Sequence, residues 1–172
     1  MDFRALRADE IECRIGTCSE KGVSILLYKD ARADMRLLDE TVGAENWDCE
    51  YTDIGGRLYC TVGIYCMLDD ESMHWVYKQD VGTESNTEAE KGQASDAFKR
   101  ACVKWGIGRE LYTAPFIWIP HERLQKHAQD RNGKWKCWDR FKVRGIGYDD
   151  GKITMLDIVN QYDFGVFRMG NG

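Results

Sequence analysis

Apolar residues recur every three or four positions in two parts of the chain, the spacing that gathers side chains on one side of an α-helix. In the first part, Met35, Leu38 and Val42 predict a helix over residues 31–42. Gly43 follows this helix, as glycine commonly follows the last helical turn.

The second helical pattern runs from about Thr87 to Trp105, and both of its ends are marked. Thr87 and Glu90 have the spacing of a capping box, and Gly106 and Gly108 stop the helix. Its apolar stripe consists of small and aromatic residues: Ala94, Ala97, Phe98, Ala101, Cys102 and Trp105.

Between the two helices, apolar and polar residues alternate, which predicts three consecutive β-strands. The first strand contains residues 47–51, the second residues 58–68, and the third begins at Met73. Gly55-Gly56 is typical of a hairpin turn between the first two. The long helix is expected to cover one face of this antiparallel meander, because its apolar stripe needs a partner.

Other segments predict shorter elements. Strands are expected at residues 23–28, 116–119, 141–147 and 152–159, the last two forming a C-terminal hairpin. Short helices are expected at residues 1–12 and 121–129, and the tail after Gln161 is expected to be loose. The predicted fold class is α+β, with an antiparallel meander packed on a long helix in one domain spanning residues 1–172.

Composition favours an ordinary folded protein, since 43% of the 172 residues are apolar and 12% are aromatic. No apolar run approaches the ~20 residues that cross a bilayer. Met1 to Glu12 lacks the apolar segment of a secretory signal. We therefore expect a cytoplasmic location and no membrane partner.

The cysteines and histidines give no metal-binding pattern. Seven cysteines are scattered without a C-x-x-C pair, and the chain has three histidines. Buried reduced thiols are the more usual reading of such cysteines. No metal or other cofactor is expected.

Charge is distributed unevenly along the chain. The whole chain carries −5, but residues 99–144 contain 12 Lys or Arg and four Asp or Glu, a local net charge of +8. Such asymmetry points to a local anionic partner. A solvated basic face without a partner explains the charge alone equally well.

Catalytic motifs are missing from the sequence. It has no Gly-x-Ser-x-Gly elbow, phosphate-binding loop or dinucleotide fingerprint, so no catalytic residue is assigned. Asp69, Asp70 and Glu71 could hold a metal for a nuclease. They lie in an expected hairpin turn, however, where acids commonly serve turn geometry.

Basic residues on the two helices offer a better candidate site. Arg32 and Arg36 are one turn apart on the first helix, and Lys99, Arg100 and Lys104 lie off the apolar stripe of the second. If the helices border one groove, these five cations form a phosphate-binding surface.

Aromatic residues accompany the later basic segment. Trp135, Trp138 and Tyr112 are candidate stacking platforms for unpaired bases. For each of them, a position in the core is the more usual one.

The order of these parts resembles the single-strand annealing proteins of the Rad52 superfamily, which include phage and bacterial recombinases. The similarity covers about residues 23–112 and leaves 113–172 as a basic extension. It rests on two motifs, Leu38-Asp39-Glu40-x-Val42-Gly43-x-x-x-Trp47 and Ser95-Asp96-x-x-Lys99-Arg100-Ala101-x-x-x-Trp105-Gly106. Between them, Asp80-Val81-Gly82 occupies the place of a similar acidic-Val-Gly turn.

The resemblance implies ATP-independent binding of single-stranded DNA and annealing of complementary strands in recombination or repair, as for a phage recombinase in a bacterial host. It implies rings or arcs of subunits with DNA in an outer basic groove, and no hydrolysis, metal or cofactor. A phage exonuclease or a single-strand-binding protein would be a further partner. A metal-dependent nuclease and a protein-interaction module remain the alternatives.

By motif position, Lys99 and Arg100 would contact the DNA backbone. The family often has another base one turn further on, where this chain has Val103, and Lys104 would take its place. Arg32 lies beside Ala33, the position of the family's groove arginine.

Overall fold

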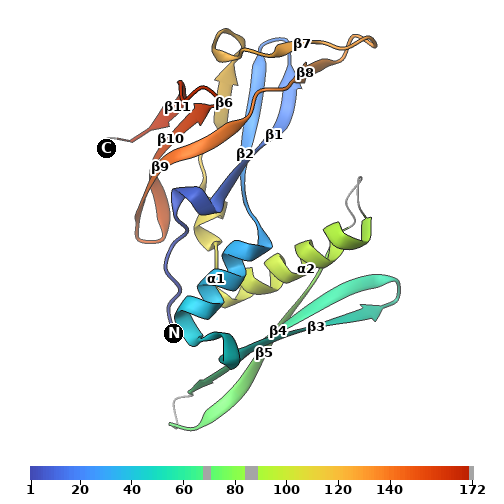
Figure 1. The fold of residues 1–172 in the computed structure, drawn as a ribbon, viewed down its shortest axis with the longest axis vertical. Coiled ribbons are helices and arrows are strands. Elements are labelled where there is room, and N and C mark those ends of the chain that lie inside the picture. The colour runs from blue at the N-terminus through green and yellow to red at the C-terminus, as the bar shows by residue number, and fades with distance from the viewer. Residues whose placement is uncertain (68–70, 84–88, 171–172) are drawn as a thin grey trace. The chain divides into compact units, whose positions relative to one another are not determined.

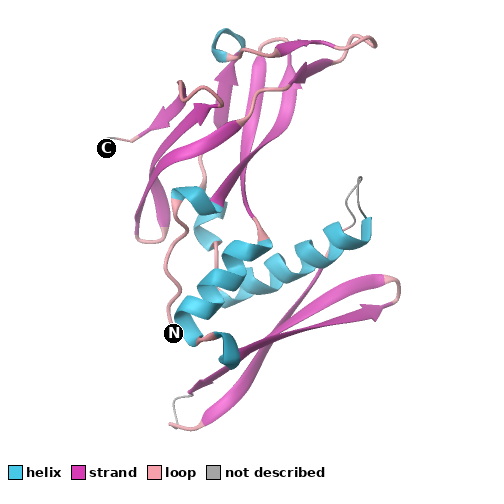
Figure 2. Cartoon of the chain, in the orientation of Figure 1, coloured by secondary structure: helices cyan, strands magenta, loops and turns pink. Residues whose placement is uncertain are grey.

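The computed structural model describes residues 1–67, 71–83 and 89–170. Within these ranges the protein is mostly antiparallel β-sheet with two α-helices, which confirms the predicted α+β class (Figures 1 and 2). The chain divides into two compact units, each built from two segments. Unit 1 is Met1–Arg4 with Asp30–Gly108, and unit 2 is Ala5–Lys29 with Arg109–Gly172. The expectation of one annealing domain over residues 1–172 stays a prediction.

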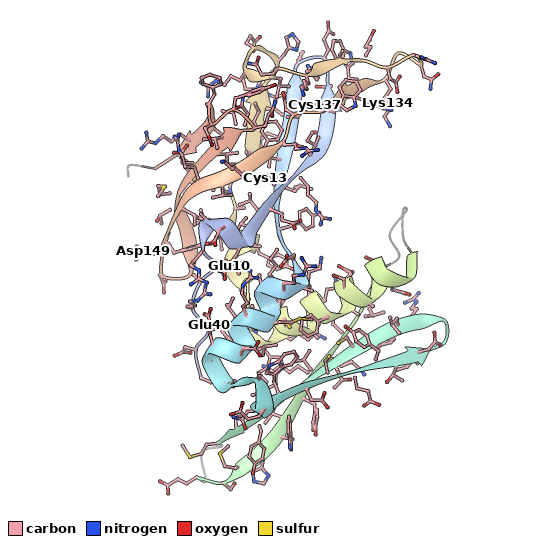
Figure 3. All side chains as sticks on the ribbon, viewed as in Figure 1. Glu10, Cys13, Glu40, Lys134, Cys137 and Asp149 are labelled. Atoms are coloured by element: carbon pink, nitrogen blue, oxygen red, sulfur yellow. The ribbon has the colours of Figure 1, made fainter. Side chains whose placement is uncertain are left out.

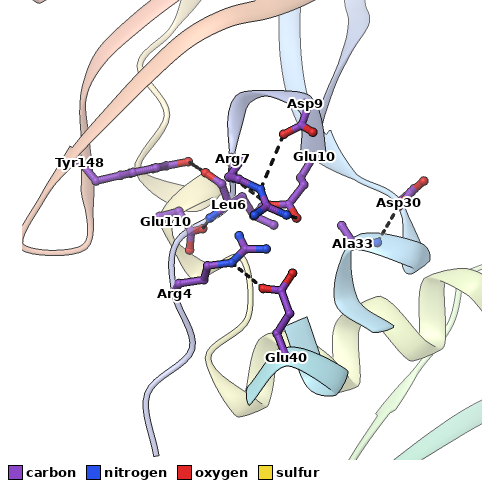
Figure 4. Close-up of polar contacts among 10 residues, drawn as sticks. All are labelled: Arg4, Leu6, Arg7, Asp9, Glu10, Asp30, Ala33, Glu40, Glu110 and Tyr148. Atoms are coloured by element: carbon purple, nitrogen blue, oxygen red, sulfur yellow. Dashed lines mark hydrogen bonds and ion pairs between the residues drawn. The ribbon is translucent and has the colours of Figure 1, made fainter. Parts of the chain in front are cut away.

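In unit 1, helix α1 spans Ala31–Val42 and begins at a side-chain cap. Asp30 Oδ1 accepts a hydrogen bond from Ala33 N at 2.7 Å, which satisfies one of the free N–H groups of the first turn (Figure 4). Leu37 and Leu38 are fully buried, whereas Met35 is 39% exposed. The sequence pattern grouped Met35 with Leu38 and Val42 on one apolar side of the helix, but the packed side runs through Leu37 and Leu38 instead.

The sheet of unit 1 consists of three consecutive antiparallel strands. They are β3 (Trp47–Ile54), β4 (Arg57–Met67) and β5 (Met73–Val81), in the order β3-β4-β5. Residues 60, 62 and 64 of the central strand are completely buried, as expected for alternate positions on one face. Both helices lie on the same side of this sheet (Figure 1).

Helix α2 spans Ala89–Trp105 and packs against β4 and β5. Its buried side consists of Ala97, Phe98, Ala101 and Cys102. The ring of Phe98 lies 6.1 Å from that of Trp47, and Trp105 Nε1 donates to Val62 O at 3.1 Å. Gly106, with φ of 112°, ends the helix. Thr87 of the expected capping box lies outside the described residues.

Gly82 lets the end of β5 approach the α2 backbone very closely. Its N–H donates to Leu58 O at 2.9 Å, so it still belongs to the sheet. A Cβ atom at this position would overlap Gln93 O and would lie 3.0 Å from Ala97 N. Any side chain here would therefore push the helix and the strand apart.

Unit 2 is built on a six-stranded antiparallel sheet in the order β11-β10-β9-β1-β2-β6. Its strands are β1 (Ile11–Ser19), β2 (Gly22–Lys29), β6 (Ile117–Pro120), β9 (Phe141–Asp149), β10 (Lys152–Asn160) and β11 (Gly165–Met169). The predicted strands near residues 23–28 and 116–119 are present, and so is the hairpin of β9 and β10.

The start of unit 2 is not the predicted helix over residues 1–12. Only a 3-10 turn at Ala8–Glu10 precedes β1. Leu6 is buried, its N–H donates to Glu110 Oε1 at 2.7 Å, and its carbonyl accepts from Tyr148 Oη at 2.8 Å (Figure 4). These distant partners occupy the backbone groups that a helix would have used.

Two other expectations for unit 2 were wrong. Residues 121–129 form a 3-10 turn at His121–Arg123 and strand β7 at His127–Gln129, which pairs with β8 (Trp135–Cys137). The tail after Gln161 is not loose, because β11 pairs with β10 there. A further 3-10 turn lies at Arg109–Thr113 and another, in unit 1, at Ala44–Asn46.

Replacing Gly82 by Ala is expected to lower the free energy of unfolding by about 1–3 kcal/mol, because the new methyl group overlaps helix backbone. Urea denaturation followed by circular dichroism measures this change. Gly145→Ala is the matched control, since the nearest atom to its added Cβ is the flexible end of Met155 at 3.6 Å. Equal stability of the two variants would contradict the close approach.

Candidate nucleic-acid interface

The predicted cations of α1 lie on its exposed side. Arg32 and Arg36 are both exposed, whereas Ala33, Leu37 and Leu38 face the core. Because Arg32 and Arg36 are four residues apart, they lie one above the other on the same side of the helix. The caps at Asp30 and Gly43 hold this helix in place.

The predicted cations of α2 lie on two different sides of that helix. Arg100 and Lys104 are exposed and one turn apart, on the side next to β5. Lys99 is half-buried and lies about 100° around the helix from Arg100. α1 packs against α2, so all five predicted residues belong to the helical layer of unit 1.

Asp80 of β5 joins Arg100 and Lys104. Its Oδ1 lies 3.4 Å from Arg100 Nε, and its Oδ2 lies 3.4 Å from Lys104 Nζ. Lys104 Nζ also donates to the carbonyl of Gln79. The strand thus orients both side chains before any ligand is present.

Lys78, two residues before Asp80 on β5, is a third cation beside Arg100 and Lys104. Its Nζ donates to Lys104 O at 2.9 Å and lies 4.5 Å from the centre of the Trp105 ring. We call Lys78, Asp80, Arg100 and Lys104 the Asp80 cluster. It combines three cations with one carboxylate, so it keeps a net charge of +2.

The neighbouring cations shape the acidity of Asp80. Burial raises the pKa of its carboxyl, but the Val81 N–H and the charges of Arg100 and Lys104 lower the pKa by more. The net pKa lies below the ordinary value, so Asp80 stays ionised near neutral pH. A permanent carboxylate explains how three cations can lie close together.

Arg32 and Lys99 differ from the members of the cluster. Within residues 1–67, 71–83 and 89–170, neither of them makes an ion pair. Their charges are therefore available to an external anion, whereas Arg100 and Lys104 must share theirs with Asp80.

Other motif residues have structural roles. Asp96 Oδ2 accepts hydrogen bonds from the backbone N and the Oγ1 of Thr83, at 2.9 and 2.8 Å. Together with the tight contact of Gly82, these bonds tie the end of β5 to α2. The motifs that contain Gly82 and Asp96 thus position the Asp80 cluster as well as supplying charged residues to it.

Sequence reasoning missed Lys78 and the bridging role of Asp80. Both alternate with exposed residues on β5, so period-two patterning could have placed them on the helix side of the strand. Their partners on α2 are 20 or more residues away in sequence, and local patterns do not identify such pairs.

The aromatic candidates of unit 2 are not all buried. Tyr112 and Trp138 are exposed, so the core interpretation was wrong for these two. Trp135 is half-buried, and its ring lies 4.8 Å from that of His127.

The nuclease alternative gains no support in the region that can be described. Asp69 and Asp70 lie outside the described residues, and Glu71 is exposed. In the part of the chain that the structure describes, no group of three or more His, Cys, Asp or Glu side chains is placed to hold a metal ion. The seven cysteines are free thiols, but only Cys60 and Cys102 are buried, so the predicted burial was wrong for the other five, which are half-buried. Among the described residues, no helix is long and apolar enough to span a bilayer.

Comparison with known proteins places this arrangement in a family. The family model described as "Rad52/22 family double-strand break repair protein" matches residues 4–132. The chain belongs to the Rad52/22 family. This confirms the resemblance seen in the two sequence motifs, and the family match includes every member of the Asp80 cluster.

One curated relative is named as a DNA-binding protein. The chain is 37% identical over 97 residues to the single-stranded DNA-binding protein DdrA of Deinococcus radiodurans. The match covers 55% of this chain but 43% of DdrA, so this Rad52/22 family member corresponds to less than half of its relative. No solved structure matches the chain.

Asp80→Asn should lower the stability of this Rad52/22 family member at pH 7 by less than about 1 kcal/mol, since the partner cations are half-exposed. The pKa of Asp80 is depressed in the folded state, so its contribution is present above the unfolded-state pKa, about 3.9. The contribution disappears as pH falls through the folded-state pKa. Thermal unfolding at several pH values should thus show the difference between the two proteins shrinking as pH falls below the unfolded-state pKa.

Asp149→Asn is the control for this measurement. Asp149 is exposed at the end of β9 (Figure 3) and has no ion pair among the described residues. A pH-independent difference between wild type and Asp80→Asn would count against the charge interaction.

Proposed function

We propose that the protein binds single-stranded DNA and anneals complementary strands in recombination or repair, without ATP, metal or covalent chemistry. The observation that carries this proposal is the positively charged Asp80 cluster within a Rad52/22 family match. The name of DdrA, a single-stranded DNA-binding protein, points to the same ligand.

Arg100 and Lys104 would bind phosphates in this scheme, and Lys99, Arg32 and Arg36 would extend the contact along the helical layer. Asp80 holds Arg100 and Lys104 in place, so less side-chain entropy is lost when phosphate binds. One carboxylate cannot neutralise three cations, and the remaining charge is what attracts the polyanion.

Annealing would follow from how the strand is held. Contacts to phosphates carry no sequence information, so bases stay free to test a second strand. Neutralised phosphates also repel the incoming strand less. Such a protein acts by ordering the strand and screening charge, and we therefore propose that it is not an enzyme.

Assembly into a ring or arc is part of the same proposal. Among the described strands, β3 and β5 each pair only with β4, so each leaves one edge open. Joined subunits would line up many modest basic surfaces on one DNA strand, and multivalency would make their combined binding strong.

An exposed aromatic patch on the sheet supports such assembly. Tyr65, Trp75 and Tyr77 lie on the face of the sheet opposite the buried residues of β4. Their ring centres are 5.5 and 6.2 Å apart in succession. Gly63, opposite Tyr77, leaves room for its ring. Contiguous exposed apolar surface of this kind is typical of a protein interface.

We also propose the cellular setting and the partner proteins. A phage recombinase in the cytoplasm of a bacterial host would work with an exonuclease that produces single strands, or with a single-strand-binding protein. These partners follow from the proposed annealing activity.

The double variant Lys99→Ala/Arg100→Ala should weaken binding of single-stranded oligonucleotides equally for all sequences. Two lost phosphate contacts should reduce the slope of log K against log salt by about 1.4, since each contact on a single strand contributes about 0.7. Fluorescence anisotropy over a salt series measures both. Arg57→Ala/Lys152→Ala removes two exposed charges at hairpin turns and is the matched control.

Annealing of complementary oligonucleotides should be lost in the same variant, and annealing by the wild type should not require magnesium. Unchanged affinity for single-stranded DNA in Lys99→Ala/Arg100→Ala would contradict the proposed site. Magnesium-dependent cleavage that Asp70→Ala abolishes would instead support the nuclease.

Trp75→Glu is expected to reduce self-association by tenfold or more, a cost of about 1.4 kcal/mol or greater for a charge in an apolar interface. Sedimentation velocity over a concentration series measures the oligomer. Tyr112→Glu changes an exposed aromatic residue of unit 2 and is the control. A wild-type protein that stays monomeric at all concentrations would contradict the assembly.

A further inference from the structure

Unit 2 carries a second concentration of basic residues, on the hairpin of β7 and β8. The two strands pair with each other in a separate two-stranded sheet. Residues 125–140 contain five Lys or Arg and two Asp, a net charge of +3. We call this segment the basic arm; Lys134 and Cys137 mark it in Figure 3.

Exposure alternates strictly along the second half of the basic arm. Trp135 and Cys137 are half-buried and Asp139 is buried. The residues between and beside them are all exposed: Lys134, Lys136, Trp138 and Arg140. Alternate residues of an extended chain lie on one face, about 6.5 to 7 Å apart. Strand β8 covers Trp135–Cys137, and the alternation of exposure continues on both sides of it, which indicates that these four exposed residues, which we call the Trp138 stripe, share one face.

The two acidic residues of the arm, Asp130 and Asp139, both bind other groups of unit 2. Asp139 is only 6% exposed, and it accepts hydrogen bonds from the N–H groups of Gln125 and Lys126 at 2.7 and 3.2 Å, and from Gln161 Nε2 at 2.8 Å. Burial raises the pKa of Asp139, but these hydrogen bonds together lower the pKa below its ordinary value. Its charge is thus used to hold the backbone of the arm.

Asp130 has a similar role in the turn between the strands. Its Oδ1 accepts from the N–H groups of Asn132 and Lys134 at 2.9 and 3.0 Å, and its Oδ2 pairs with Lys136 at 3.1 Å. Among the described residues, Lys134 and Arg140 make no ion pair. Four of the arm's five cations, Lys126, Arg131, Lys134 and Arg140, are thus exposed and make no ion pair among the described residues, whereas Lys136 pairs with Asp130.

Trp138 is the unusual member of the stripe. The residue is 54% exposed, and its backbone N–H donates to Lys126 O at 2.9 Å, which fixes its position. Lys136 and Arg140 are the exposed cations two positions before and after it. An exposed indole between cations is the combination that proteins use to bind single strands, with bases stacked on the ring and phosphates on the charges.

We propose that the Trp138 stripe is a second binding site for single-stranded nucleic acid, in which Lys134, Lys136 and Arg140 contact phosphates and Trp138 stacks on an unpaired base. The site is carried by unit 2 alone and does not depend on the Asp80 cluster. Its residues also lie beyond residue 132, where the family match ends. A duplex hides its base faces, so the stripe should prefer single strands.

Trp138→Ala in the full chain should weaken binding of a labelled oligo-dT by about 5- to 150-fold, the range for loss of one stacked base. Trp138→Phe should recover most of the affinity, because a phenyl ring also stacks. Tyr162→Ala is the matched control, since Tyr162 is an aromatic residue of unit 2 with the same 54% exposure. Circular dichroism checks that each variant is folded.

The charges of the stripe need a separate measurement. Lys134→Ala/Arg140→Ala should reduce the salt slope of oligo-dT binding by about 1.4, whereas Lys21→Ala/Lys152→Ala, at two other exposed turns, should not. Cross-linking of an oligonucleotide that contains 5-iodouracil, mapped by mass spectrometry, should mark residues 134–140.

The same assays in the Lys99→Ala/Arg100→Ala background separate the two sites. If Trp138→Ala weakens binding in both backgrounds, the stripe is a site whether or not the Asp80 cluster binds DNA. Equal binding by Trp138→Ala and Tyr162→Ala would overturn the stripe and leave the cluster untouched. If Trp138→Ala lost the same share of its affinity for oligo-dT, for polyglutamate and for anionic vesicles, the stripe would also be overturned, because a base-stacking site must favour unpaired bases.

Discussion

The close seating of α2 on β4 and β5 is the contact on which unit 1 depends. Ala97 and Ala101 are fully buried where the helix meets the sheet, and Gly82 has no room for a side chain against the helix backbone. Small residues at such a contact bring the two backbones near enough for short polar side chains to bridge them. A wider separation would take Asp80 out of reach of Arg100 and Lys104.

The charges of the Asp80 cluster are stabilised by more than their mutual contacts. Lys104 lies in the last turn of α2, where the helix dipole favours a cation. Lys78 reaches the same end and donates to Lys104 O, one of the carbonyls that the helix leaves unpaired. The cations of the cluster are therefore ordered by contacts within unit 1.

The two units use acidic residues in different ways. In unit 1, Asp80 lies between cations and orients them. In unit 2, Asp130 and Asp139 accept backbone N–H groups and shape the basic arm, and most of its cations make no ion pair within the described part of the chain. Both arrangements concentrate positive charge locally in a chain whose total charge is −5.

Local patterns in the sequence determined the helices and most strands, because apolar periodicity, caps and glycine stops act within a few residues. The α+β class, the end of α1 at Gly43 and the hairpin of β9 and β10 followed from such signals. Tertiary structure decided what depended on distant partners. Hydrogen bonds to Tyr148 and Glu110 prevent a helix at Leu6. Pairing with β10 orders the tail as β11, and the position of β5 beside α2 places Asp80 next to Arg100. These partners are separated by many residues, and only the packed chain brings them together.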